Sequence, residues 1–372
     1  MRSGRPRTYL EVRTRRSMLS EVNQDVIRQN DRAIEIARAL IAGDCCTISW
    51  GGRIRLVAPI SDPVRRFRNT FHAPAYKLET QAIRILSAFG AAVRPATLPR
   101  KTPKPLRGFL QGAFGELAVN AVIIGTPSAH QSLVAVLSNS SGAPRATLKI
   151  AVSDKSAVSL EKEYDALRDP AVVGKAPQPL KLGDIGGQPA LLTSYVWGRA
   201  PAANRRGLLS ALPCLPAIPP TASRYSPDEH PWIRRLSMRI GNAADSLARA
   251  LPASLPSVRL HGDFAPWNVL IARARQAYAL DWEHSEPDGL PGVDIAHYII
   301  ASARLLHRSP PARAAKLAAA ALHSVTELAG PSAWAIVGLA AHFTMCREKE
   351  SGNASSAQYW RAVAHRVLEV LS

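Results

Sequence analysis

The stretch LHGDFAPWNVL, residues 260–270, places a histidine, a glycine, an aspartate and an asparagine in one short run that ends in apolar residues. It fits the spacing His-x-Asp-x-x-x-x-Asn, with His261, Asp263 and Asn268 at the named positions. The apolar run VLIA predicts a short strand, a turn follows, and the strand AYAL leads directly to Asp281. We therefore expect a hairpin that returns Asp281 beside Asn268.

These residue types supply what phosphoryl transfer requires. A carboxylate must orient the attacking hydroxyl and accept its proton, and Asp263, in a tight loop before a strand, suits that role. The amide oxygen of Asn268 and the carboxylate of Asp281 are hard ligands for Mg²⁺, which takes its other oxygens from phosphate and water. The alternative interpretation of the same residues is a polar turn that caps a buried strand.

A cation for the nucleotide phosphates is expected earlier in the chain. Lys149 lies in the predicted strand ATLKIAV, and Glu163 in the following helix SLEKEYDALRD could hold it by an ion pair. Glu161 is a rival partner on the same helix. The alternative for Lys149 is a solvent-facing lysine on an exposed strand face.

The residue patterns predict an α+β protein with two lobes. Alternation and turn residues predict five antiparallel strands and one helix over residues 111–197, with strands in 117–125, 131–142 and 146–152, a helix over 156–167, and two strands around 184–187. In the second lobe, residues 198–372, we expect an irregular proline-rich segment over 213–231, a helix over 233–251, and almost continuous helix from 296 onward.

The first 110 residues form a basic N-terminal extension. They hold 21 Lys or Arg against 8 Asp or Glu, a large part of the chain's net charge of +19. Their patterns predict a helix over 25–40, a hairpin turning at two adjacent glycines in CCTISWGGRIRLVAPI, a helix over 76–89, and a proline- and lysine-rich linker over 94–108. The charge favours an anionic partner or an acidic membrane surface, with a solvated basic surface as the plainer alternative.

Composition narrows the class of protein further. Four cysteines, of which only Cys45 and Cys46 are close together, fit neither a zinc site nor a disulfide framework, so a reducing cytoplasm is the expected location. The basic N-terminus has no following apolar segment of the kind that secretory signals contain, and no apolar run is long enough to cross a membrane. The apolar stretch 333–346 is instead expected to be a buried core helix.

HGDFAPWNVL followed by ALDWEHSEPDGLPGVDIAHY resembles the aminoglycoside phosphotransferase and choline kinase family, which has a bilobal protein-kinase-like fold. The resemblance covers residues 115 to 372 and is sharpest over 260 to 298. It implies that Asp263 is the catalytic base and that Asn268 and Asp281 bind Mg²⁺.

The same resemblance assigns the nucleotide site. TLKI looks like the strand that carries the phosphate-contacting Lys149, with Glu163 as its helical partner. ALLTSYVWGR looks like the strand and hinge whose backbone receives adenine, at Ser194, Tyr195 and Val196. His261 and Asp294 match positions with a structural or orienting role; Asp294 is expected to cap a helix and to brace the catalytic loop.

The implied activity is an ATP- and Mg-dependent transfer of the γ-phosphate to a hydroxyl of a small molecule, such as a sugar, an amino alcohol or an aminoglycoside-like compound. Proteins with similar loops and N-terminal extensions are associated with surface polysaccharide enzymes, which makes that metabolism one expected setting. The turn GTPSAHQS has a single glycine, so a kinase-like module that binds nucleotide without transferring phosphate is the alternative. A protein kinase is disfavoured, because DWE replaces a glycine-containing metal loop and no activation segment follows.

Several residues near the motif keep two interpretations. Glu283 and His284 either touch substrate or metal or are solvated, and His297 is expected to be a core histidine. Acidic residues of the helical lobe either bind an amine of the acceptor or are ordinary surface groups: Asp228, Glu229, Glu286 and Asp288.

Overall fold

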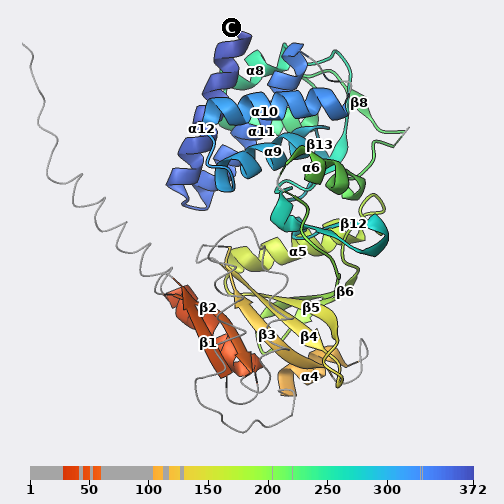
Figure 1. Cartoon of the computed structure of the whole chain (residues 1–372), viewed down its shortest axis with the longest axis vertical. Helices are drawn as coiled ribbons and strands as arrows, with labels where there is room; N and C mark the ends of the chain where they lie inside the picture. Colours follow the sequence, from red (N-terminus) through yellow and green to blue (C-terminus); the bar gives the residue numbers. More distant parts are fainter. Residues whose placement is uncertain are drawn as a thin grey trace, which may run out of the picture.

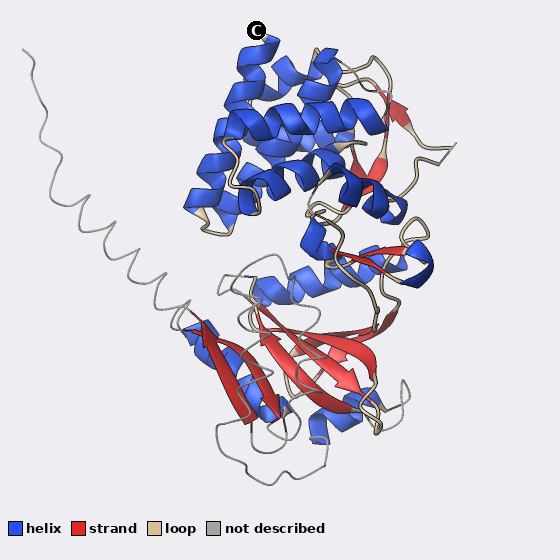
Figure 2. Cartoon of the chain, viewed as in Figure 1, coloured by secondary structure: helices blue, strands red, loops and turns tan. Residues whose placement is uncertain are grey.

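The computed structural model describes residues 28–41, 45–50, 53–59, 104–111, 117–125, 130–202, 204–219, 221–326, 328 and 330–372. Within these ranges the chain forms a lobe built on an antiparallel sheet and a second, mainly helical lobe (Figures 1 and 2). The α+β, bilobal architecture expected from the sequence is confirmed.

The five strands and the helix expected in the first lobe are all present. They are β3 (Ala118–Ile124), β4 (Ser132–Ser138), β5 (Pro144–Ala151), α5 (Asp154–Arg168), β6 (Pro179–Asp184) and β7 (Pro189–Ser194). The helix α5 begins where Ser153 accepts a hydrogen bond from the Ser156 amide, and Ser156 reciprocates in a capping box. Figure 1 shows α5 lying between the sheet and the helical lobe.

The sheet has seven strands rather than the five expected. The hairpin β1 (Cys45–Trp50) and β2 (Arg53–Pro59), predicted as part of a separate extension, pairs with β3 through Leu56 opposite Ile123 and Val57 opposite Val122. The full order is β1-β2-β3-β4-β5-β7-β6. An uncovered β3 would leave a row of unpaired backbone groups at the edge of the sheet, and the hairpin satisfies part of that row.

The expected linker over residues 94–108 is wrong at its C-terminal end, where α4 (Lys104–Leu110) is helical. Leu106, Phe109 and Leu110 are buried in the core of the first lobe, and Pro105 is tolerated because it lies in the first turn of the helix. The helix predicted over 76–89 and residues 94–103 of the linker lie outside the described residues. The predicted helix over 25–40 is described from residue 28, and it ends at residue 40.

The helical lobe is as predicted from residue 296 onward, and before that point it differs from the prediction, which lacked α6 (Arg205–Ala211) and had one helix over 233–251. Its helices are α6 (Arg205–Ala211), α7 (Pro231–Ile240), α8 (Asn242–Ala248), α9 (Val293–Leu305), α10 (Pro311–Val325), α11 (Gly330–Glu350) and α12 (Ala354–Leu371), and the short strands β8 (Arg224–Tyr225) and β9 (Leu255–Pro256) pair with each other. The single helix expected over 233–251 is two helices, because Gly241 adopts a positive φ of 59° that interrupts the first helix.

The opening motif forms the hairpin that the sequence predicted. A 3₁₀ turn (Pro266–Asn268) leads into β11 (Val269–Ile271), which pairs with β12 (Ala277–Ala279). The flanking strands β10 (Val258–Leu260) and β13 (Glu286–Gly289) pair with each other and fix both ends of the segment. The hairpin is tied to the first lobe by the Ala279 amide, which donates to the Lys175 carbonyl at 2.8 Å.

Helices α9 to α12 form most of the larger hydrophobic core, and the stretch expected as a buried core helix is the middle of α11. No helix among the described residues combines the length and the apolar character needed to cross a membrane.

Candidate active site

The catalytic loop depends on Gly262, which has a positive φ of 80°. A Cβ atom at this position would lie 2.0 Å from the carbonyl oxygen of His284, so no side chain fits. The glycine therefore allows the loop before Asp263 to pass directly over the segment that follows Asp281.

Two further residues of the motif hold this loop in place. The carboxylate of Asp294 accepts hydrogen bonds from the His261 amide at 2.8 Å and the Gly262 amide at 3.0 Å. The His261 ring bonds the Leu280 carbonyl through Nε2 at 2.7 Å and accepts from the Asp263 amide at Nδ1. A carbonyl partner requires the proton on Nε2, so the ring links the loop to the end of β12. Asp294 does not cap α9, because Gly292 occupies the N-cap position.

The side chain of Asp263 is held from three directions. The Asn268 amide nitrogen donates to Oδ2 and to the backbone carbonyl of Asp263, both at 2.9 Å. Arg347 of α11 donates to Oδ1 at 2.6 Å, and the His297 Nε2 lies 3.5 Å from the same oxygen. Burial would raise the pKa of Asp263, but the Arg347 guanidinium and then His297 hold that pKa well below its usual range.

Lys149 lies at the centre of a second, carboxylate-rich cluster. Its Nζ donates to Glu163 at 2.6 Å and to Asp281, and Glu283 lies 3.7 Å away. Burial would lower the pKa of Lys149, but Asp281 and Glu163 outweigh burial and raise this pKa well above its ordinary value. Glu161, the rival partner considered from the sequence, is exposed on α5.

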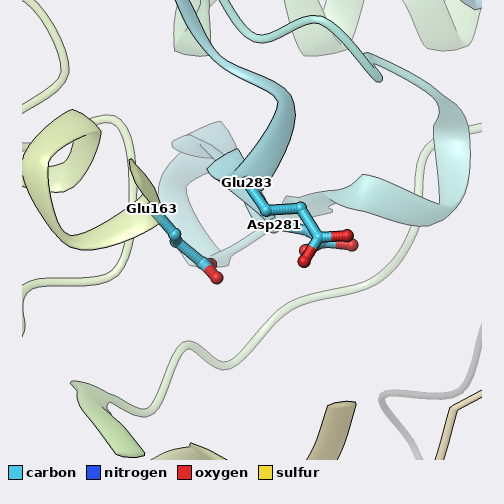
Figure 3. Close-up of side chains that lie close together, drawn as sticks. All are labelled: Glu163, Asp281 and Glu283. Atoms are coloured by element: carbon cyan, nitrogen blue, oxygen red, sulfur yellow. The ribbon is translucent and has the colours of Figure 1, made fainter. Parts of the chain in front are cut away.

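The carboxylates of this cluster converge from two elements. Figure 3 shows Glu163, from α5, facing Asp281 and Glu283, from the turn after β12. Their oxygens lie within 4.8 Å of one another, close enough to hold a metal ion. Burial, and then the charge of Asp281, raises the pKa of Glu283 to about 8. Asp281 adopts a left-handed backbone with φ of 67°, an unusual conformation for a non-glycine residue that often marks functional sites.

The oxygens needed for Mg²⁺ are available at this site. Because the Asn268 amide nitrogen donates to Asp263, the side-chain carbonyl oxygen of Asn268 is the atom that it could offer to a metal. The backbone of Asn268 is fixed near Asp281 by the Leu280 amide, which donates to the Asn268 carbonyl at 2.7 Å. An amide oxygen and one or two carboxylates are the small set of hard ligands that Mg²⁺ takes from proteins.

A pocket of about 690 Å³ lies where the two lobes join. It is lined by Ser194, Tyr195, Val196, Trp197, Ala272, Arg273 and Tyr278. The amides of Ser194 and Tyr195 are used within the sheet, donating to the carbonyls of Gln178 and Arg145. The Val196 amide, by contrast, makes no hydrogen bond within the part of the chain that the structure describes.

The structure brings one residue to Asp263 that the sequence did not single out, and it shows the partners of others that the sequence did. Arg347 lies 84 residues after Asp263 in a helix without a readable motif, so no sequence signal pointed to it. His297 is buried as expected, stacked on Trp360, but it also reaches Asp263. The acidic pair Glu286 and Asp288 is already bound by Arg235, which donates to both carboxylates.

Comparison with known proteins decides the family. A model of the phosphotransferase enzyme family (APH) matches residues 127–336, more than half of the chain. The chain belongs to this family. It is the family that the HGDFAPWN and DWE motifs predicted, and the protein therefore has the family's bilobal, protein-kinase-like fold.

Solved structures similar to this phosphotransferase family member include three kinases of small molecules. A GDP complex of aminoglycoside 2'-phosphotransferase-IIIa is 13% identical and covers 71% of this chain and 97% of its own, with a TM-score of 0.41. Plasmodium vivax ethanolamine kinase is 11% identical and covers 78% of this chain and 89% of its own, with a TM-score of 0.46. A putative fructosamine-3-kinase from Haemophilus somnus is 12% identical and covers 72% of this chain and 97% of its own, with a TM-score of 0.43. No curated protein sequence matches the chain.

Proposed function

We propose that this protein is an ATP- and Mg-dependent phosphotransferase that moves the γ-phosphate to a hydroxyl of a small molecule. The observation that carries the proposal is the convergence of Asp263, Asn268, Asp281 and Lys149 around one site, within a chain of the phosphotransferase family. The acceptor classes are a sugar, an amino alcohol or an aminoglycoside-like compound, and sugars of surface polysaccharides belong among those tested first.

Asp263 is the group that receives the acceptor hydroxyl. Its carboxylate is ionised and held by Asn268 and Arg347, so it can orient the hydroxyl toward the nucleotide and take up the proton as the bond to phosphorus forms. Because these hydrogen bonds make the Asp263 carboxylate a weak base, it would orient the acceptor hydroxyl first and take its proton only later. This order suits a transition state in which the bond between the acceptor oxygen and phosphorus forms late.

Asn268 and Asp281 would hold Mg²⁺, with Glu283 as an additional carboxylate beside them. The ion supplies positive charge that offsets the charge of the phosphates. Lys149 would contact the phosphates and keep Glu163 as its partner, while its ion pair with Asp281 gives way to the nucleotide. The pair with Glu163 keeps the lysine directed into the site in both states.

The junction between the lobes would receive the nucleotide base. The pocket there includes Ser194, Tyr195 and Val196, and the unused Val196 amide is a hydrogen-bond donor for a base nitrogen. This arrangement supports the backbone recognition of adenine that the family resemblance implied.

Asp263→Ala tests the catalytic assignment. We expect it to reduce ATP-dependent phosphorylation by at least about 1000-fold, because the acceptor hydroxyl loses its orienting base. Binding of MgATP, measured as an increase in melting temperature, should stay close to that of the wild type. Turnover is measured with sugars, amino alcohols and aminoglycosides as acceptors. Unchanged turnover in the variant would rule out Asp263 as the catalytic residue.

The second candidate is a kinase-like module that binds nucleotide without transferring phosphate. The single glycine, Gly125, before the turn between β3 and β4 favours it, since the phosphates would have less backbone around them than in a glycine-rich loop. Stabilisation by MgATP, with neither transfer nor hydrolysis in the wild type, would select this candidate over the enzyme.

A further inference from the structure

The loop that carries Asp263 contains no positive charge of its own. Between Asp263 and Asn268 the chain has only Phe264, Ala265, Pro266 and Trp267. The cation that contacts the catalytic carboxylate comes instead from Arg347, in the last turn of α11. Its Nη1 donates to the Gly262 carbonyl at 2.5 Å and its Nη2 to Asp263 Oδ1 at 2.6 Å.

Arg347 and Asn268 together fix the orientation of the carboxylate. Arg347 bonds Oδ1 and the Asn268 amide nitrogen bonds Oδ2, so rotation of the Asp263 side chain would break a bond at each oxygen. A carboxylate offers about four lone-pair positions. The bonds from Arg347 and Asn268, with the more distant His297, therefore leave at least one lone pair of Asp263 for an acceptor hydroxyl. The fixed carboxylate determines the direction from which that hydroxyl can approach.

Arg347 is itself held where it can do this. Its side chain is only 14% exposed, and it lies at the C-terminal end of a helix, where a positive charge is favourable. The two donors grip two different acceptors, the Gly262 backbone and the Asp263 side chain, which requires the planar fork of a guanidinium. A lysine ammonium could reach one of these acceptors but would not fix the angle between them.

We propose that Arg347 is a positioning residue for phosphoryl transfer, which acts by holding the Asp263 carboxylate in the direction of the acceptor hydroxyl. This role rests on the proposed function. It assigns to α11, far from the motif in sequence, a direct part in the reaction centre.

Arg347→Gln and Arg347→Lys test the proposal, with MgATP as the probe and water or a hydroxyl compound as the acceptor. Misplacement of a reacting group costs up to about 100-fold in rate. We expect Arg347→Gln to lower kcat by about 10- to 100-fold, with KM for MgATP changed less than about 3-fold, and Arg347→Lys to recover part of the loss. Assays are run well below the melting temperature of each variant, so that a loss of folded protein does not mimic the effect.

Arg239→Gln is the matched control. Arg239 pairs with Glu350 at the same end of α11, at 2.5 Å, but this pair is on the surface, and Arg239 is not among the groups that act on Asp263. The control removes the same charge from the same region, and kcat should stay within about 2-fold of the wild type. An equal loss of kcat in both variants would overturn the proposal in favour of a general charge effect.

A double-mutant cycle with Asp263→Asn separates positioning from an independent role. If Arg347 acts through Asp263, then Arg347→Gln should cause little further loss of turnover once the carboxylate is gone. Losses that multiply, an unchanged kcat in Arg347→Gln, or a rise in KM for MgATP alone would each overturn the proposal. Failure of the proposed function is recognised separately, because wild-type protein would then show no turnover of MgATP.

Discussion

At the scale of single residues, the site is built on backbone positions that admit only particular side chains. Gly262 has no space for a Cβ atom and lies in the left-handed region, while Asp281 accepts a left-handed backbone with a side chain. The conformation of Gly262 sets the position of the loop before Asp263, and that of Asp281 sets the start of the turn after β12. The placement of the proposed site residues therefore depends on the backbone conformation at these two positions.

Gly262→Ala should disable the site and destabilise the fold. The new Cβ would meet the His284 carbonyl, which is backbone and cannot move aside cheaply, so the catalytic loop must shift. We expect a loss of about 2 kcal/mol or more in the free energy of unfolding, and at least about 100-fold in turnover of MgATP. Thermal or urea unfolding and a phosphorylation assay measure the two effects.

Gly187→Ala is the control for that substitution. Gly187 also has a positive φ, 84°, but nothing lies near its added Cβ. This variant should show only the cost of the left-handed backbone, about 1 kcal/mol, with normal turnover. If Gly262→Ala behaves no differently from Gly187→Ala, the close approach to His284 is not what constrains the loop.

The candidate site residues that the sequence indicated lie in a short motif or in adjacent elements, and the contact from a distant helix was not among them. Asp263, Asn268 and Asp281 are recognisable because one hairpin presents all three, and Lys149 with Glu163 because strand and helix are adjacent. Arg347 lies in a helix with no distinctive spacing, and its contact with Asp263 exists only once α11 packs behind the loop. A contact between residues that are distant in the chain, formed only by tertiary packing, leaves no local pattern in the sequence.

At the scale of helices and strands, local sequence signals predicted the presence of most elements, but they predicted the ends of these elements less well. The strands β3 to β7 were predicted from alternation and turn residues, and α5 was predicted over 156–167, whereas it begins at Asp154 after the Ser153 cap. The single helix expected over 233–251 divides at Gly241, because a glycine within an otherwise helical pattern can either continue or end the helix. The short helix α4 was not predicted because it lies at the end of a proline- and lysine-rich segment, although its apolar residues are buried.

Within α11, His342 predicts a pH dependence of stability. The ring is buried, neither nitrogen has a hydrogen-bond partner among the described residues, and burial lowers its pKa to about 4. Between about pH 6.5 and pH 4 the unfolded chain binds a proton that the folded chain does not. The free energy of unfolding therefore falls as the pH drops from about 6.5 toward 4, and the contribution of His342 is fully present only above about pH 6.5.

His342→Leu should remove this acid sensitivity. Relative to the wild type, the variant should lose about 2 kcal/mol less in the free energy of unfolding between about pH 7.5 and pH 5. Urea unfolding at the two pH values gives the difference, and the same substitution at the exposed His323 is the matched control for loss of a histidine. Equal losses in wild type and His342→Leu would show that the folded chain protonates this ring easily.

At the scale of the whole molecule, the N-terminal extension is partly merged with the first lobe. The sequence suggested a separate basic segment, because its charge and proline content differ from the rest of the chain. The structure pairs its hairpin with β3 and packs its helix over residues 28–40 against the core of the first lobe. Strand pairing between distant segments depends on which sheet edge is open, which the sequence of the hairpin does not state.

Leu40→Ala tests whether this extension and the first lobe fold as one unit. Leu40 is 5% exposed and belongs to the same buried cluster as residues of β3, β4 and β5. Truncating it should lower the free energy of unfolding of the whole protein by about 2 kcal/mol, in a single transition whose midpoint still rises with MgATP. Arg38→Ala, on the exposed side of the same helix, should have little effect. A separate early transition in Leu40→Ala, with the MgATP-sensitive transition unchanged, would instead mean that the extension is an independent appendage on the phosphotransferase fold.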